Sequence, residues 1–564
     1  MILEELKAKI AAGLGLAKAD FSYPPKMEMG DLSLACFEVA KTRSQSPVDT
    51  ARELCRVALG HNELKLYFSR IEASGPYLNF FVDHKFLASR VLAEVAGQGR
   101  KYGYNEVGSG KRVMIEYSNG NTHKEYHIGH LRNISFGDAV TRLLLAGGYK
   151  AVPVSYINDF GGHVAKTIWF WRLNKKYQDQ SGPKGYLLGQ CYAEASRSLA
   201  ADPSQKEAVS LVMKQIENRR GDNYRAWRET RRWSLRYLDK IYRELGIRFK
   251  DTFYESEVID EGLRIVNDFK ERGLLKSSQG AVIADLEEYG LGVLPIIRSD
   301  GTTLYPVGDL ALAGLKFDKY NLDESIYVVD VRQSLYLKQL FKLLALSGDA
   351  RPRRQLSYDF VTLPEGMMAS RTGNVITYQY LKDQVFAKIV EETGVRHKDW
   401  SRAKVAKVAK ILTVATIKFE MLKVSPEKTI TFNVAEALRF DGYTACYLEY
   451  GYARLSSIRR KQGLRFRFKR PDLSLLTEQK ERGLLLKIAK YPKAVQLARQ
   501  NYNPSEISKY LFELVQASND YYHETNILKA EPALRSARLA LVKSIIQVLH
   551  NGFSLLGIEP LKEM

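Results

Sequence analysis

Two histidines, His127 and His130, have the side chains best suited to bind phosphate in this sequence. They flank Gly129 in the four-residue pattern 127–130. They follow an apolar run at 112–117 that reads as a buried strand, and they precede 131–146, where apolar spacing predicts a helix. A helix N-terminus offers free N–H groups and the positive end of the helix dipole. Glycine lets a planar base approach the backbone, and two imidazoles can donate to phosphoryl oxygens. We therefore predict a phosphate-binding turn, although such a four-residue pattern also occurs by chance.

Clustered histidines also raise the question of a metal. Four of the nine histidines lie between positions 123 and 163, with His123 in the loop before the predicted helix. No carboxylate or cysteine completes a familiar ligand set around them. The four cysteines are scattered and form no C-x-x-C pair. We therefore expect no zinc site, and we expect the cysteines to be small buried apolar residues.

A second candidate loop, 364–374, follows the last strand expected in the central part of the chain. It combines two glycines with Met368, the hydroxyl of Ser370 and the cationic side chain of Arg371. Such a loop could close over a departing pyrophosphate. Taken alone, a segment of this composition is more often an ordinary surface loop.

The elements that position these loops form an alternating pattern. Strand-like and helical runs alternate across 106–400, which predicts a doubly wound, Rossmann-like parallel sheet. Charged helical sequence replaces the alternation at about 165–285, and we interpret it as an insertion. The strands of the α/β domain are expected at 112–117, 152–157, 293–297, 325–331 and 358–363.

Two further domains flank this region. Residues 1–105 mix helical and strand-like runs, with strands expected at 65–71 and 77–82, which predicts a small α+β domain. Residues 401–564 have helical apolar spacing nearly throughout, which predicts an all-α bundle. There is no long apolar run and no signal-peptide pattern, so we expect a cytoplasmic protein without membrane contact.

The charge of the chain points to a polyanionic partner. The net charge is +21, and residues 401–564 hold 28 Lys and Arg against 15 Asp and Glu. A solvated loop would explain a basic tract, but interleaved aromatic residues favour RNA because they can stack on unpaired bases. The basic side chains that we expect to contact RNA are Arg459, Arg460, Lys461, Arg465 and Arg467.

The two candidate loops, one after the first strand and one after the last, resemble the paired signatures of class I aminoacyl-tRNA synthetases. Within that class the chain is most similar to the arginyl-tRNA synthetases, over nearly its whole length. The segments that carry the resemblance are 116–132, 300–309, 327–333, 24–31, 75–81 and 534–558.

The resemblance implies ligation of L-arginine to tRNA(Arg) with ATP, through an arginyl-adenylate. Fixed carboxylates match the planar guanidinium group, and we assign this role to Glu116 and Asp309, with Tyr305 as a wall. Asn121 and Gln333 are assigned to the α-amino and carboxylate ends of arginine. A strand-end cap for Glu116, or a helix-start role for Asp309, is the structural alternative.

Catalysis of adenylate formation is expected to be electrostatic. Lys124, His127 and His130 are expected to supply a positive field on one side of ATP, with Ser370 and Arg371 on the other. The second loop has no lysine, so the resemblance gives Lys124 added weight. Mg²⁺ is expected to arrive with ATP and to be held largely by the phosphates.

Two other functions remain open from the sequence. One is a catalytically silent, RNA-binding paralogue that keeps the basic surface but has lost the chemistry. The other is a class I synthetase for a different amino acid. We also expect a monomer.

Overall fold

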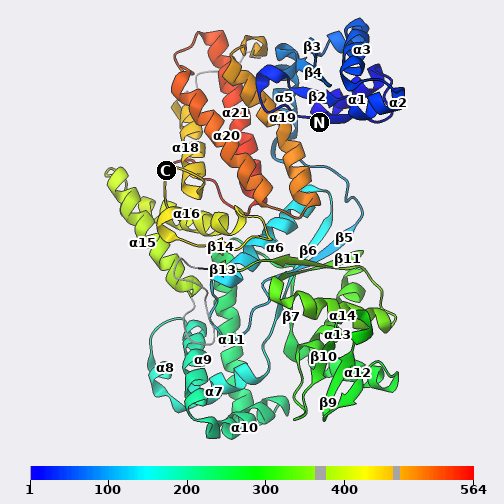
Figure 1. Cartoon of the computed structure of the whole chain (residues 1–564). Coiled ribbons are helices and arrows are strands. Elements are labelled where there is room, and N and C mark those ends of the chain that lie inside the picture. The colour runs from blue at the N-terminus through cyan, green and yellow to red at the C-terminus, as the bar shows by residue number, and fades with distance from the viewer. Residues whose placement is uncertain (1, 363–375, 462–470) are drawn as a thin grey trace.

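The computed structural model describes residues 2–362, 376–461 and 471–564. The small N-terminal domain and the C-terminal helices lie at one end of the molecule, the parallel sheet lies in the middle, and the helices of the insertion and a small antiparallel sheet with its helices lie at the other end (Figure 1). The predicted fold class, a multidomain α/β plus all-α protein, is confirmed. The domain boundaries at 105/106 and 400/401 stay a prediction.

The N-terminal domain packs helices on an antiparallel sheet with strand order β1-β2-β4-β3. Helix α3 begins at Pro47 because the hydroxyl of Ser46 caps its N-terminus, accepting the Asp49 N–H at 3.1 Å. The elements are α1 (Ile2–Gly13), β1 (Asp20–Ser22), β2 (Leu32–Ala35), α2 (Phe37–Arg43), α3 (Pro47–Gly60), α4 (Asn62–Lys65), β3 (Phe68–Ser74), β4 (Tyr77–Val82) and α5 (His84–Gln98).

The central sheet has five parallel strands in the order β12-β11-β5-β6-β7. The next two strands along the chain, β6 and β7, lie on one side of β5, and the later strands β11 and β12 lie on the other. The topological switch point therefore lies between β5 and β11. Ligands bind at the carboxyl ends of the strands beside such a switch point. The strands are β5 (Arg112–Glu116), β6 (Lys150–Ile157), β7 (Asp251–Tyr254), β11 (Glu324–Asp330) and β12 (Arg353–Tyr358).

One predicted strand of the parallel sheet lies elsewhere. Residues 293–297 form β10 (Val293–Ile297), but β10 pairs antiparallel with β9 (Ala281–Asp285) in a separate sheet completed by β8 (Lys276–Ser278). Gln279 and Gly280 join β8 to β9 with positive φ angles, the signature of a tight hairpin turn. Apolar content identified the strand, but it carries no information on the strand's partners.

The predicted insertion is helical but shorter than expected. Its helices are α7 (Gly162–Leu173), α8 (Lys175–Asp179), α9 (Lys184–Ala201), α10 (Lys206–Glu217) and α11 (Gly221–Glu244). The chain returns to the parallel sheet at β7, within the range 165–285 that we assigned to the insertion. A four-residue strand inside charged sequence gives too short an apolar run to be recognised.

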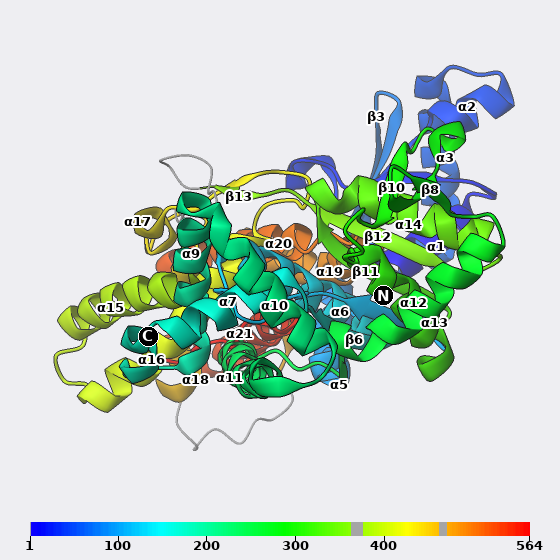
Figure 2. The ribbon, with the colours of Figure 1, turned by 90° about the horizontal axis from the view of Figure 1, so that it is seen from below.

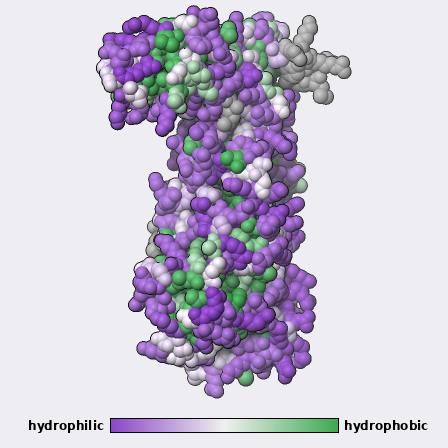
Figure 3. Space-filling model, turned by 90° about the vertical axis from the view of Figure 1, so that its right-hand side faces the viewer, coloured by the Kyte–Doolittle hydropathy of each residue, from purple (hydrophilic) through white to green (hydrophobic). Residues whose placement is uncertain are grey.

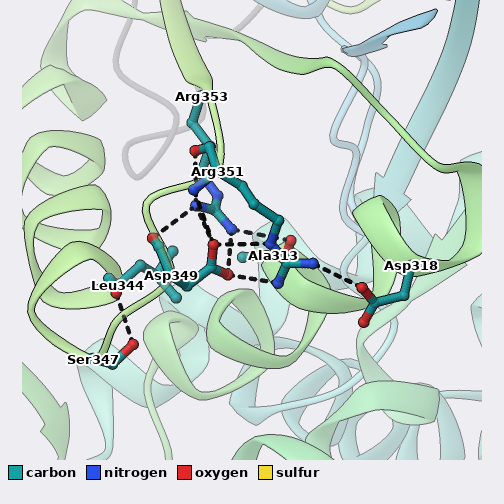
Figure 4. Close-up of polar contacts among 7 residues, drawn as sticks. All are labelled: Ala313, Asp318, Leu344, Ser347, Asp349, Arg351 and Arg353. Carbon is teal, nitrogen blue, oxygen red and sulfur yellow. Dashed lines mark hydrogen bonds and ion pairs between the residues drawn. The ribbon is translucent and has the colours of Figure 1, made fainter.

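The remaining helices of the central region cover the sheet and the antiparallel module. They are α12 (Glu255–Glu271), α13 (Tyr305–Tyr320) and α14 (Ser334–Leu346). The loop from α14 to β12 is fixed by Asp349, which accepts from Arg351 at 2.6 Å and from Arg353 at 2.7 Å (Figure 4). Arg351 also pairs with Asp318 at 2.7 Å, so this cluster ties the last strand to α13. The hydrogen bonds and positive charges of these two guanidinium groups hold the pKa of Asp349 well below its usual range.

The C-terminal bundle agrees with the predicted all-α domain. One predicted helix, 436–461, is divided in two because the chain turns at Gly442, which has a φ of 81°. Before the bundle lie β13 (Val361–Thr362), which pairs with β14 (Ile430–Thr431), and α15 (Tyr378–Arg396); the helices after them are α16 (Arg402–Leu422), α17 (Val434–Ala437), α18 (Ala445–Lys461), α19 (Gln479–Gln500), α20 (Ser505–Glu524) and α21 (Pro532–Leu555).

Helix α6 (Ile128–Ala146) joins the sheet to this bundle. It is buried along most of its length and packs against α16, α19 and α21. Arg132 on α6 is 1% exposed and donates to the carbonyls of Met421 and, at 3.1 Å, Ser425. The Met421 carbonyl lies in the last turn of α16, where a helix leaves its last acceptors unpaired, and Ser425 lies three residues beyond the helix.

The surface is largely hydrophilic. On the face seen in Figure 3, apolar side chains gather mainly in the lower half, the part that carries α12, α13 and α14. Among the described residues, no helix is long and apolar enough to cross a membrane. The four cysteines carry free thiols; Cys36, Cys191 and Cys446 are buried, as predicted, whereas Cys55 is only partly buried.

Candidate active site

The turn between β5 and α6 is built as a histidine-capped helix start. His127 is the N-cap of α6, and its Nδ1 accepts the Gly129 N–H at 3.2 Å. The Nδ1 of His130 in turn accepts the His127 N–H at 3.1 Å. The two rings lie with their centroids 3.8 Å apart. Both imidazoles are therefore held by the backbone at the N-terminus of the helix.

These hydrogen bonds define which ring nitrogen can serve a ligand. A neutral imidazole that accepts at Nδ1 carries its proton on Nε2, so both rings present an Nε2–H donor. Burial, aided by the charge of Lys124, lowers the pKa of His127 to about 4 and the pKa of His130 well below its usual value. At neutral pH these histidines therefore offer donors but no charge. Burial thus favours the neutral, donating form of both rings, and the assignment of Lys124, His127 and His130 to ATP stays a prediction.

His123 holds the same loop in place. It is 1% exposed, and its ring nitrogens contact the hydroxyls of Thr122 at 2.9 Å and Thr230 at 2.8 Å. Its backbone N–H donates to the Ser234 hydroxyl at 3.1 Å. Its φ is +61°, and Ser118 earlier in the loop has a φ of +57°. Helix α11, which supplies Thr230 and Ser234, thus stabilises a backbone conformation that costs energy for residues other than glycine.

A buried charge cluster lies beside this turn, at the carboxyl end of β5. Glu116 is 4% exposed; its Oε2 contacts the ammonium of Lys316, and its Oε1 accepts from Asn119 at 3.0 Å. Lys316 is 1% exposed and lies 4.3 Å from the ring centroid of Tyr327 on β11. Asp309 precedes Lys316 by about two turns of α13, so the two residues share one face of that helix.

Asp309 has a different environment from Glu116. The phenol of Tyr336 donates to its Oδ2. Burial raises the pKa of Asp309 to about 6, and the nearby charge of Glu116 acts in the same direction. Burial and the charge of Asp309 raise the pKa of Glu255, at the start of α12, to about 8. Carboxyl groups with pKa values displaced this far are typical of functional sites.

The sequence did not reveal Lys316, Tyr336 or Glu255 as members of this cluster. Lys316 could have been suspected because it repeats on the same helix face as Asp309. Tyr336 lies three residues beyond the segment 327–333 that carries the family resemblance, and its contact with Asp309 depends on the packing of α14 against α13. Glu255 has no sequence signal that we recognise.

The other residues assigned to arginine, Asn121, Tyr305 and Gln333, are not members of the buried charge cluster. Asn121 forms a β-bridge with Asn158, which connects the first loop to the end of β6. Tyr305 begins α13, one turn before Asp309, and is 58% exposed. Gln333 is exposed in the short helical turn Val331–Gln333 that follows β11. All three lie where strands or helices open to solvent.

Several predicted site residues cannot be placed. Met368, Ser370 and Arg371 of the second loop, and Arg465 and Arg467 of the basic tract, lie outside the described residues. Arg459, Arg460 and Lys461 are exposed in the last turn of α18, and Arg460 donates to the Lys562 carbonyl at 2.5 Å. Within the described ranges, no group of three His, Cys, Asp or Glu side chains could hold a metal ion.

The parallel sheet with its histidine-capped helix at the switch point defines the catalytic domain of a class I aminoacyl-tRNA synthetase. Residues 91–433 match the family described as "tRNA synthetases class I (R), catalytic domain". Residues 1–82 match the arginyl-tRNA synthetase N-terminal domain, and residues 448–564 match the DALR anticodon-binding domain. The chain belongs to the arginyl-tRNA synthetase family.

Individual relatives match over the whole chain. The arginine–tRNA ligase of Bdellovibrio bacteriovorus is 34% identical over 96% of this chain and 93% of its own length. That of Clostridium perfringens is 31% identical over 100% and 99%. The arginyl-tRNA synthetase structure from Thermus thermophilus has a TM-score of 0.80 at 25% identity, covering 100% of this chain and 99% of that one.

Proposed function

We propose that this chain ligates L-arginine to tRNA(Arg) with ATP, forming an arginyl-adenylate and releasing pyrophosphate and then AMP. The observation that carries the proposal is the buried cluster of Glu116, Lys316 and Asp309 beside the histidine-capped start of α6. It joins a cation-binding pocket to a phosphate-binding turn at the switch point of the sheet, where an amino acid and ATP must meet.

The charges of the cluster suit one cationic side chain. The ion pair with Lys316 neutralises Glu116, which leaves Asp309 as the carboxylate whose charge a guanidinium group would balance. Glu116 keeps acceptor capacity, because each carboxylate oxygen can accept two hydrogen bonds. An aliphatic side chain here would leave Asp309 buried without a counter-charge, which is costly. In this proposal Tyr305 forms a wall, Asn121 binds the α-amino group and Gln333 lies near the carboxylate.

The phosphate side works by placement of donors and charge. Attack of the arginine carboxylate on the α-phosphorus builds negative charge on that centre and on the departing pyrophosphate. The Nε2–H groups of His127 and His130 donate to the phosphoryl oxygens, Lys124 supplies positive charge, and Gly129 admits the nucleotide. Ser370 and Arg371, with Met368, act from the second loop. Removal of one such donor costs roughly 10²–10³ in rate.

The proposed reaction also involves Mg²⁺ and a tRNA-binding surface. Mg²⁺ accompanies ATP and is bound largely by its phosphates. The basic residues Arg459, Arg460, Lys461, Arg465 and Arg467 contact tRNA. The protein acts as a monomer in the cytoplasm.

Arginine-dependent exchange between ATP and pyrophosphate, measured with and without tRNA(Arg), tests the proposal. Exchange with arginine in the presence of tRNA is expected, and no other amino acid should support it. Asp309→Asn should abolish arginine use while tRNA binding is retained. Absence of exchange with every amino acid, tRNA being present, would leave the silent RNA-binding paralogue as the better description.

A further inference from the structure

A basic groove runs along α11 on the side away from the histidine loop. It has a volume of about 1170 Å³, and it is bounded by α11, by the edge strand β7 and by the start of α12. Thr230 and Ser234 hold the histidine loop from one face of α11, whereas Arg228, Arg232 and Arg236 lie on the opposite face by helical spacing. Figure 2 looks nearly along α11, which lies at the edge of the molecule.

Seven arginines and three carboxylates line this groove. Three of the arginines have partners: Arg219 pairs with Asp260 at 2.7 Å, Arg243 pairs with Asp239 at 2.8 Å, and Arg231 contacts the buried Asp159. The other four, Arg228, Arg232, Arg236 and Arg248, are exposed and have no ion pair among the described residues.

The four arginines without ion pairs are arranged in a regular way. Arg228, Arg232 and Arg236 repeat every four residues, which spaces them about 6 Å apart along the helix axis. Like charges at this spacing repel one another and weaken a helix. Intramolecular contacts therefore do not explain the row, and a ligand with evenly spaced negative charges would.

We propose that the α11 groove binds the phosphodiester backbone of RNA, at a site separate from the catalytic pocket and from the basic tract at the end of α18. Guanidinium groups recognise phosphate by paired N–H donors. Tyr224 lies at the same groove and stacks on Trp227 with ring centroids 5.3 Å apart, which offers an aromatic surface near the row. The choice of RNA rests on the proposed function, because tRNA is the polyanion that this reaction uses.

The floor of the groove connects it to the active site. Asp159 accepts from Arg231 and, at 2.8 Å, from the hydroxyl of Ser256, and it directly follows Asn158, which forms the bridge to Asn121. Asp159 is fully buried, so it separates the groove from the pocket as part of a common wall. RNA bound in the groove would thus lie one layer of side chains from the first loop without entering the pocket.

The test compares two triple variants of the full-length protein. R228Q/R232Q/R236Q removes the row, and K206Q/K214Q/R225Q removes three exposed cations of the same insertion that do not line the groove. Binding of tRNA(Arg) is measured between about 50 and 200 mM salt. Each lost phosphate contact lowers the slope of log K against log salt by about 0.7–0.9, so the groove variant should lose about two to three units of slope, and its loss of affinity should be about 20- to 40-fold larger at about 50 mM than at about 200 mM salt.

Kinetics separate this site from the catalytic one. In the groove variant, the KM for tRNA should rise while kcat at saturating tRNA and the KM for arginine stay unchanged. R228K/R232K/R236K, which keeps the charges, should recover most of the salt slope. A groove variant that matches the cation control in slope and KM would overturn the proposal, and would instead favour an acidic protein as the ligand. If the parent protein itself fails to charge tRNA(Arg), the proposed function fails, whereas unchanged binding in a parent that charges normally rejects only the groove.

Discussion

At the scale of single residues, the pocket is defined by how three charges share a buried volume. Glu116 and Lys316 pair across β5 and α13, and Asp309 accepts from Tyr336 on α14. The assignment of Glu116 and Asp309 to arginine followed from the family resemblance and stays a prediction. Lys316 could not be assigned to Glu116, because 200 positions separate the two residues and only the packing of α13 against the sheet brings them together.

Arginine affinity should depend on pH through Asp309. Its pKa is raised to about 6 by burial, so the carboxylate needed to balance a guanidinium group is lost as the pH falls through about 6. The KM for arginine should therefore rise, approaching about tenfold per pH unit below that value, while kcat at saturating arginine changes little. Steady-state exchange kinetics from pH 5 to 8 would measure this.

The effect of Asp309 on the KM for arginine can be distinguished from the titration of His127 and of Glu255. His127, with a pKa lowered to about 4, stays neutral across the range, so the phosphate side should not contribute. Glu255→Gln removes the carboxyl whose pKa is raised to about 8 and should keep the rise in KM near pH 6. A flat KM for arginine between pH 5 and 7 would contradict the assignment of Asp309.

The ion pair of Glu116 and Lys316 should be strongly coupled in stability. Lys316→Met leaves Glu116 buried without its partner and should lower the free energy of unfolding by about 3–5 kcal/mol. The double variant E116Q/K316M removes both charges and should recover most of that loss. Urea unfolding of the two single variants and the double variant gives the coupling. Losses that simply add would show that the pair is not an energetic unit.

At the scale of elements, helix α11 supports the loop between β5 and α6 with one face. Its Thr230 and Ser234 bind His123 and fix the loop between β5 and α6. The helix itself was evident from charged, periodic sequence. Its role was not, because the insertion looks like an addition to the fold, and nothing local to 206–245 indicates that its hydroxyls reach a loop more than 100 positions earlier.

Thr230→Val tests this support. The change keeps the shape of the side chain but removes the hydroxyl bonded to the buried ring of His123, which should cost about 1–3 kcal/mol of stability. The kcat for adenylate formation should fall, because the donors on α6 follow the loop. Thr167→Val, on α7, is the control, since its hydroxyl bonds only to the His163 carbonyl of its own helix. Equal kinetics in both variants would argue against the role of α11.

For the strands as well, the sequence predicted local structure better than the pairing of distant segments. The apolar run at 112–117 predicted β5 correctly, since a strand buried on both faces reads as a continuous apolar segment. β7 was missed because four residues at the edge of the sheet need little apolar content. β10 was assigned to the wrong sheet because a short apolar run does not show whether a strand pairs with parallel or antiparallel neighbours.

At the scale of the whole molecule, α6 belongs to two domains. Its N-terminal turn carries His127 and His130, and its remaining length is buried against α16, α19 and α21. Arg132 closes the C-terminal end of α16, and Lys418 of α16 contacts Asp138 of α6 at 3.1 Å. The division into catalytic and helical domains followed from the sequence, but this shared helix did not, because apolar spacing does not indicate which neighbours cover it.

Arg132→Met should loosen both domains together. The variant leaves the Met421 carbonyl of α16 and the Ser425 carbonyl beyond it without this donor, at about 1–3 kcal/mol for each unpaired group. Hydrogen exchange should accelerate both in the last turn of α16 and along α6. Arg172→Met, at an exposed arginine of α7, is the control. Faster exchange confined to α16 would mean that α6 is held independently of the bundle.

The burial of α6 also limits how this protein can be recombined. A chimera that takes its C-terminal helices from a relative would place foreign side chains around Arg132 and Asp138, which contact Met421 and Lys418 of α16. The natural unit for such an exchange is therefore the helical domain together with the covered surface of α6. The residues of α6 that must be exchanged with the anticodon-binding domain thus lie within 20 positions of His127, in the turn proposed to bind phosphate.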